Sequence, residues 1–294
     1  KMYVTLEPCC HHGKTKPCID ELIKYNFGRV YYAEIDKNPI VNGKSINKLK
    51  KKGIETRICK IDYKKYQINK TFFKSLILNK PFLILKIASS QDGMIFLKKN
   101  SNKWITNELS RKYVHLLRAK SDCILIGSST VEKDNPLLNC RIDGLEKKSP
   151  DIFILDTNLN LKKNLNIHRV KNRKIFVLHN SSYYKNMKNS TNLKYLRINK
   201  KKGRLDLTVA LKQISKMGYH NVFVEGGKKL NTSLIKENLV DELYWFKSDK
   251  NYGSKGIFAI ESQKLNIKSI KNKFKIMDKK YFAGDILKIY KRIN

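Results

Sequence analysis

The feature that most limits the fold of this chain is a set of short, almost entirely apolar segments that alternate with amphipathic ones. Runs of this length, rich in Val, Ile, Leu and Phe, are typical of strands buried on both faces of a parallel sheet. They lie at 82–90, 123–127, 152–156, 174–179 and 221–225. Segments with helical periodicity, over 107–119 and 206–217, lie between them. The sequence therefore predicts an α/β fold with a mostly parallel sheet.

The first part of the chain shows the same alternation in shorter segments. Strands are expected at 3–6, 29–35 and 54–61, and helices at 18–25, 43–52 and 65–78. Lys80 precedes Pro81, and a residue before proline is disfavoured in a helix, so a boundary falls here. We therefore expect two α/β domains, residues 1–79 and residues 80–294.

The charge balance is strongly basic. Sixty-two Lys and Arg against 25 Asp and Glu give a formal net charge of +37 over 294 residues, as in many nucleic-acid-binding proteins. However, only about ten of the basic residues are arginine, and Asn and Ile are also abundant, as in proteins encoded by AT-rich genes. The lysines are scattered over the whole chain, so a solvated lysine-rich surface is favoured over a nucleic-acid interface.

The sequence contains no membrane or export signal. No apolar run approaches the length of a bilayer-spanning helix, and the first residues lack the apolar stretch of a signal peptide. The six cysteines are therefore expected to be reduced thiols or metal ligands, and the expected location is the cytoplasm. The chain starts directly in a motif, without a preceding strand or helix, which is the pattern of a fragment of a longer protein.

The sharpest local motif is TLEPC at 5–9, followed by His11, His12 and the dipeptide Pro17-Cys18. A strand that ends in Pro-Cys, with a second cysteine at the start of a helix, places two thiols within reach of one metal ion. The helix N-terminus is also expected to lower the pKa of Cys18 and so to favour its thiolate. On spacing alone, a metal site and a pair of buried free cysteines are equally favoured.

TLEPC resembles the zinc-dependent cytidine-deaminase superfamily, in which an upstream His-x-Glu supplies the third zinc ligand and the proton shuttle. The eight residues between Cys9 and Cys18, and the DKNP stretch at 36–39, resemble the deaminase domain of the bifunctional riboflavin-biosynthesis deaminase/reductase family. This resemblance implies Zn²⁺ bound by Cys9 and Cys18. The sequence contains no His-x-Glu, so both groups are expected upstream of Lys1, and no catalytic residue is assigned.

The second part of the chain carries the same resemblance in more motifs. In chain order they are Lys86, SQDG (90–93), WIT (104–106), Arg118-Ala119, Gly127 to Thr130, DNPL (134–137), Arg141 and VEGG (224–227). The family's reductase domain is similar to dihydrofolate reductase in fold. The resemblance implies NADPH as cofactor, reduction of the ribosyl group of a phosphoribosylaminopyrimidine, and a homodimer through this domain.

Two small-residue turns suit an anionic ligand on physical grounds. EGG at 225–227 lies between a buried strand and a helix, where backbone N–H groups and the helix dipole attract phosphate and glycine permits close approach. Residues 127–130 form a second turn of this kind. Neither is a GxGxxG fingerprint, so a Rossmann fold is not expected. Arg118 and Arg141 suit bidentate binding of a sugar phosphate.

The resemblance also implies two sets of binding residues. Those expected to contact NADP are Ala88, Trp104, Thr130, Asp134, Thr157, Gly227, Lys228, Lys229, Leu230, Asn231, Thr232 and Ser233. Those expected to hold the substrate are Asn102, Arg118, Leu138, Arg141 and Glu225. Trp104 is alternatively a core residue, and Asp134 alternatively caps the turn before Pro136. Glu225 and Asp92 are the titratable candidates for a proton donor, and neither is assigned.

The leading hypothesis is a riboflavin-biosynthesis enzyme that reduces 5-amino-6-(5-phosphoribosylamino)uracil with NADPH, and that in its intact form also deaminates the diaminopyrimidine precursor with zinc. One alternative is a reductase with a non-catalytic deaminase remnant. Another is a basic nucleic-acid-binding protein with a structural zinc. A small-molecule substrate is favoured, without a membrane or nucleic-acid partner, and the first 75 residues are expected to be less stable than the rest.

Overall fold

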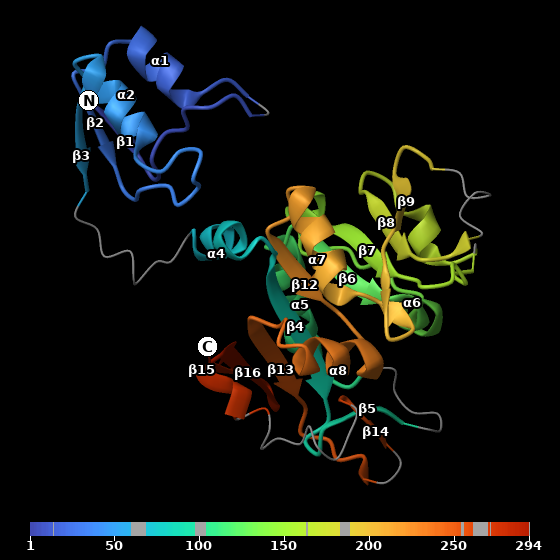
Figure 1. The fold of residues 1–294 in the computed structure, drawn as a ribbon. Helices are drawn as coiled ribbons and strands as arrows, with labels where there is room; N and C mark the ends of the chain where they lie inside the picture. Colours follow the sequence, from blue (N-terminus) through green and yellow to red (C-terminus); the bar gives the residue numbers. More distant parts are fainter. Residues whose placement is uncertain are drawn as a thin grey trace. The chain divides into compact units, whose positions relative to one another are not determined.

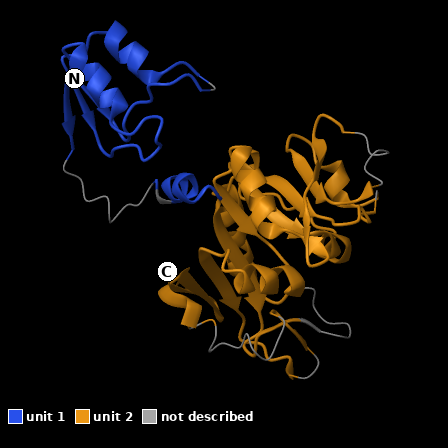
Figure 2. Cartoon of the chain, in the orientation of Figure 1, with its two compact units in different colours: residues 1–80 blue, residues 81–294 orange. Residues whose placement is uncertain are grey.

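The structure of the protein is a computed structural model. It describes residues 1–13, 15–59, 69–97, 104–162, 164–182, 189–253, 256–260, 270 and 272–293. The chain divides into two compact units, Lys1–Lys80 and Pro81–Asn294, coloured separately in Figure 2. In the part of the chain that is described, no helix is both long and apolar enough to cross a membrane.

The first unit is built on a three-stranded parallel sheet in the order β1-β2-β3. Its elements are β1 (Met2–Val4), α1 (Cys18–Lys24), β2 (Arg29–Tyr32), α2 (Lys44–Lys51), β3 (Glu55–Ile58) and α4 (Lys70–Leu78). Ile19 and Leu22 of α1 pack against Val30 of β2, Leu49 of α2 and Ile54. Residues 65–68 of the helix expected over 65–78 lie outside the described residues.

The second unit contains a nine-stranded sheet in the order β15-β16-β13-β4-β12-β6-β7-β8-β9 (Figure 1). The strands are β4 (Phe82–Ser89), β6 (Cys123–Gly127), β7 (Asp151–Leu155), β8 (Ile175–His179), β9 (Leu193–Arg197), β12 (Asn221–Val224), β13 (Glu242–Lys247), β15 (Phe274–Phe282) and β16 (Asp285–Arg292). Neighbours from β13 to β9 are parallel, as predicted. The sheet as a whole is mixed, because β16 runs antiparallel to both β13 and β15.

Helices cover both faces of this sheet. α5 (Glu108–Ala119), α6 (Ser128–Asp134) and the 3₁₀ turn η2 (Asn166–Arg169) pack on one face, and α7 (Leu207–Lys216) and α8 (Lys228–Lys236) pack on the other. In β4, Leu83, Leu85 and Ile87 face α7 and α8, and Ile84 faces α5. Burial on both faces explains why the central strands are almost continuously apolar.

The remaining elements are short. β5 (Met94–Leu97) pairs with β14 (Gly256–Phe258), β10 (Lys200–Lys201) pairs with β11 (Arg204–Leu205), and η1 (Glu146–Lys148) is a 3₁₀ turn. One local prediction was wrong: residues 127–130 are not a turn, because Gly127 ends β6 and α6 begins at Ser128. The β15–β16 hairpin fixes the start of α5, since the Asp285 carboxylate accepts hydrogen bonds from the backbone N–H of Asn107 at 2.8 Å and from the Ser110 hydroxyl at 2.7 Å.

Candidate active site

A largely buried cluster of three charged side chains, Lys86, Arg118 and Glu225, lies on the α5 side of the sheet. Lys86 faces this side because Leu85 and Ile87, its neighbours in β4, face the other. Glu225 follows β12, the strand beside β4, and faces the same side as Lys86 because the preceding Val224 faces the other. Arg118 reaches Glu225 from the last turn of α5. Its Nε lies 2.6 Å from Oε1 and its Nη2 lies 3.0 Å from Oε2. Two parallel hydrogen bonds of this kind fix the relative orientation of both groups.

The members of this cluster shift one another's pKa. Burial lowers the pKa of Lys86, and the Glu225 charge opposes this only in part. Burial alone raises the pKa of Glu225, but the Arg118 guanidinium and Lys86 outweigh it, so the pKa lies below the ordinary carboxyl value. His115, one turn before Arg118, has a lowered pKa because of burial and of the Arg118 charge. Glu225 is therefore an ionised carboxylate at neutral pH.

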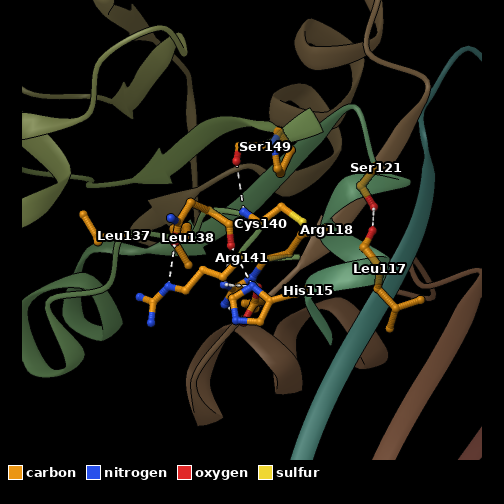
Figure 3. Close-up of polar contacts among 12 residues, drawn as sticks. His115, Leu117, Arg118, Ser121, Leu137, Leu138, Cys140, Arg141 and Ser149 are labelled. Carbon is orange, nitrogen blue, oxygen red and sulfur yellow. Dashed lines mark hydrogen bonds and ion pairs between the residues drawn. The ribbon is translucent and has the colours of Figure 1, made fainter. Parts of the chain in front are cut away.

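The segment 137–141 lies beside this cluster. Figure 3 shows His115 and Arg118 close to this segment, which includes Leu138 and Arg141. Leu138 is buried in the core, and its backbone takes a φ of 52°. Arg141 is exposed, and its Nε donates to Asn139 Oδ1 at 3.2 Å.

A groove of about 860 Å³ opens next to this segment, and Arg141 lines it together with Asn139, Lys147 and Lys171. Of the residues expected to hold the substrate, Arg118 and Glu225 bind each other and Arg141 faces this groove. The Leu138 side chain is buried, and its carbonyl oxygen accepts a hydrogen bond from Arg173. Asn102 lies outside the described residues.

The carboxyl ends of β6 and β12 form a glycine cradle. The N-caps of α6 and α8 are Gly127 and Gly227, and neither helix has a side-chain cap. A Cβ on Gly227 would lie 2.9 Å from Thr130 Oγ1, and a Cβ on Gly226 would lie 2.6 Å from Asn231 Oδ1. Uncapped N–H groups and the dipole of α8 attract an anion. Glycine is therefore required at both positions by close packing, and the uncapped N–H groups at the start of α8 suit an anion such as a pyrophosphate.

Other expected cofactor residues lie near this edge of the sheet. Ala88 lies near the end of β4, on the Lys86 side and partly exposed, and Thr157 follows β7. Asp134 ends α6, and its charge acts on Lys86. Trp104 is 53% exposed, so the alternative that it is a core residue was wrong.

The segment 227–233 divides into an outer and an inner side. Lys229 is exposed, and Gly227, Lys228 and Ser233 are partly exposed. The other three residues of the segment are buried, and their side chains face the protein interior rather than a ligand: Leu230, Asn231 and Thr232. A cofactor at this helix is therefore expected to contact backbone N–H groups more than side chains.

In the first unit, Cys9 and Cys18 lie together. The Cys18 amide donates to Cys9 Sγ at 3.2 Å. The pKa of the Cys18 thiol is raised, first by its hydrogen bond with the Cys9 thiol and then by burial, which is opposite to the lowering expected from the helix N-terminus. Among the residues that the structure describes, no group of three or more His, Cys, Asp or Glu side chains is arranged to hold a metal ion.

Glu7 connects the TLEPC motif to the start of α2. Its buried carboxylate accepts hydrogen bonds from the backbone N–H of Gly43 at 2.9 Å, Ser45 at 3.2 Å and Asp36 at 3.3 Å. These bonds satisfy donors at a helix N-terminus that glycine cannot cap with a side chain. Glu7 is therefore a structural residue.

Comparison with known proteins establishes the family. A family model described as the RibD C-terminal domain matches residues 81–276. This chain belongs to the RibD family. The riboflavin biosynthesis protein RibD of Aquifex aeolicus is 32% identical to it over 293 residues, covering 99% of this chain and 80% of the relative. The family places the chain in riboflavin biosynthesis, with a reductase-type domain in its second unit.

Solved RibD structures share this fold. RibD of Acinetobacter baumannii matches with a TM-score of 0.83 at 27% identity, covering 99% of this chain and 80% of that chain. A Thermotoga maritima protein matches with a TM-score of 0.77 at 27% identity, covering 99% and 79%. That protein is described as a diaminohydroxyphosphoribosylaminopyrimidine deaminase/5-amino-6-(5-phosphoribosylamino)uracil reductase.

Sequence reasoning did not assign a function to Lys86 in this RibD chain, although it noted the residue as a landmark. The signal was present: a lysine within the apolar run FLILKIAS requires a buried partner if both faces of that strand are covered. His115 carries no motif. Its Nδ1 lies 3.5 Å from Nη1 of Arg118 on the same helix. The same Nδ1 lies 2.9 Å from the Asn139 carbonyl oxygen, and this second contact joins residues 24 positions apart, so only the fold brings it about.

Proposed function

We propose that the second unit reduces the ribosyl group of 5-amino-6-(5-phosphoribosylamino)uracil with NADPH; the Thermotoga maritima protein is described as a reductase of that same compound. The observation that carries the proposal is the buried cluster of Lys86, Arg118 and Glu225 at the same edge of the sheet as the glycine cradle. A cradle for a dinucleotide beside fixed charges for a polar substrate is what a nicotinamide reductase requires.

The cofactor would be held mainly by backbone. The pyrophosphate would lie against the N–H groups of the first turn of α8, which have no side-chain cap, and glycine is needed at 226 and 227 because a Cβ there would meet Asn231 or Thr130. Thr130 lies in the first turn of α6, directly after β6, and Thr157 follows β7, the strand beside β6. When bound, NADPH supplies the hydride, and the protein contributes alignment and exclusion of water.

The substrate would be held by charge. Arg141, exposed in the groove, suits the phosphate of the substrate. The Lys86 ammonium is the cation on the inner side, next to the Glu225 carboxylate. Arg118 holds Glu225 ionised and in a fixed orientation, so that the carboxylate accepts hydrogen bonds from sugar hydroxyls rather than turning away.

For the first unit we propose only that Cys9 and Cys18 form a pair of metal-binding thiols. A structural or catalytic zinc site takes three or four protein ligands, and the described residues supply two. The fit is therefore incomplete, and no deamination step is derived for this unit.

NADPH oxidation followed at 340 nm with the phosphoribosylaminouracil substrate tests the reductase function. We expect turnover by the wild-type chain and a fall of about 100-fold in kcat/KM for Arg118→Ala, because truncation leaves the Glu225 carboxylate without its bidentate partner. Arg169→Ala, at an exposed arginine of η2, is the matched control and should retain wild-type activity. A folded wild-type protein that neither oxidises nor binds NADPH would contradict the proposal.

A further inference from the structure

Three consecutive backbone carbonyls of the segment 137–141 are held by side chains rather than by secondary structure. Arg173 Nη2 donates to the Leu137 oxygen at 2.6 Å, and its Nη1 donates to the Leu138 oxygen at 2.7 Å. The Asn139 oxygen lies 2.9 Å from both His115 Nδ1 and Arg118 Nη1. The path of this segment is thus determined by cationic and imidazole groups from α5 and from the loop before β8.

Arg173 is the least expected of these groups. It is only 8% exposed, and its Nη1 also donates to the Pro150 oxygen at 3.1 Å. Among the described residues it donates to carbonyl oxygens and makes no ion pair with a carboxylate. Burial, with the Arg118 charge in addition, lowers the pKa of Arg173 to about 10. The Asp151 charge opposes this lowering only in part. A largely buried cation whose hydrogen bonds all go to carbonyl oxygens is costly, so its position implies a geometric requirement.

The geometric requirement is the backbone conformation of the segment 137–141. Leu138 has a left-handed φ of 52°, which is unfavourable for a residue with a branched side chain. Its buried side chain and the two bonds from Arg173 hold it in this conformation. Arg141 follows three residues later and lines the groove, as Arg173 itself does. The position of Arg141 therefore depends on the bonds from Arg173 to the Leu137 and Leu138 carbonyls, together with those from His115 and Arg118 to the Asn139 carbonyl.

We propose that Arg173 is a positioning residue for substrate binding: by holding the Leu137 and Leu138 carbonyls it places Arg141 to receive the anionic end of the substrate. This inference rests on the proposed reductase function. A planar guanidinium reaches three fixed acceptors at once. A lysine in the same place carries one compact charge on a flexible stem, so it cannot maintain the same arrangement.

Steady-state kinetics of Arg173→Lys and Arg173→Met test the proposal, with KM and kcat measured separately and the Kd of NADPH determined by fluorescence titration. We expect KM for the phosphoribosylaminouracil to rise about tenfold or more in both variants, the loss of roughly one charge-assisted contact. The Kd of NADPH should stay within about twofold of wild type, because the glycine cradle belongs to other loops. Arg169→Lys and Arg169→Met, at an exposed site, are matched controls.

The outcomes separate this inference from the proposed function. A wild-type KM in Arg173→Lys, or a loss of NADPH affinity equal to the rise in KM, would overturn the positioning role while wild-type turnover leaves the reductase intact. If Arg173→Met does not fold, Arg173→Lys decides, since it keeps a buried donor and cation. Absence of turnover in the wild-type protein would overturn both.

Discussion

At the scale of single residues, the main feature of the site is one carboxylate, Glu225, that interacts with two cationic side chains, Lys86 and Arg118, largely away from water. Lys86 and Arg118 both act on Glu225, and Asp134, the other carboxylate that acts on Lys86, is exposed. Removing Arg118 leaves a Lys86–Glu225 pair. Removing the charge of Glu225 leaves two cations without a buried counter-charge, so the carboxylate matters more to stability than either cation.

This asymmetry gives a stability prediction. We expect Glu225→Gln to destabilise the second unit by about 3–5 kcal/mol at pH 7, and Arg118→Met by about 1–3 kcal/mol. Both tryptophans, Trp104 and Trp245, lie in this unit, so urea unfolding followed by tryptophan fluorescence measures it alone. Equal losses in the two variants would show that the charges do not interact as described.

The pH dependence of the same measurement has a defined sign. Because the pKa of Glu225 is lower in the folded protein, its stabilising contribution is present above the ordinary carboxyl pKa and is lost as pH falls through the folded value. The difference in unfolding free energy between wild type and Glu225→Gln should therefore narrow in acid. A difference that widens as the pH falls below the ordinary carboxyl pKa would contradict this.

At the scale of elements, the buried strands of the nine-stranded sheet could be predicted from sequence and its two edge strands could not. β4, β6, β7, β8 and β12 coincide to within a residue or two with the apolar runs. β9 (LKYLR) and β15 (FKIMDKKYF) lie at the two edges of the sheet, and charged residues interrupt both, so neither carries an apolar run. In a lysine-rich chain, such strands lack the apolar pattern by which a strand is predicted from sequence.

The candidate site shows the same division. The motifs EGG and Arg118-Ala119 could be found in the sequence because each is local. The bidentate contact between Arg118 and Glu225 joins residues 107 positions apart, and no local pattern encodes it. The bonds of Arg173 to the segment 137–141 have the same character. They depend on the register of parallel strands, which brings loops from distant parts of the chain to one edge.

The glycine cradle gives a prediction for the connection between β12 and α8. Gly226→Ala places a Cβ 2.6 Å from the buried Asn231 Oδ1 and 3.2 Å from Leu230 Cβ, and these groups are packed too tightly to move freely. We expect a loss of about 1–3 kcal/mol in stability and weaker NADPH binding. Gly127→Ala is the stability control, because nothing lies within 4 Å of its added Cβ. Wild-type stability and NADPH affinity in Gly226→Ala would show that close approach is not needed.

At the scale of the whole molecule, the two units differ most in the size of their cores. Among its described residues, the first unit buries one small cluster, formed by Ile19, Leu22, Val30, Leu49 and Ile54. The second unit buries two large clusters, one on each face of its sheet. The stability of a unit rises with the apolar surface that it removes from water, so the same chain is expected to contain a weak unit and a strong one.

Native-state hydrogen exchange under increasing urea measures this difference directly. Amides of β2 and α2 should lose protection at lower urea than those of β4, β6 and β12, because the small cluster of the first unit opens before the sheet of the second. Tryptophan fluorescence should remain native at that point, since both tryptophans report on the second unit. Equal protection of both units up to one common transition would mean that the small core is not the weaker one, and that contacts other than apolar burial stabilise the first unit.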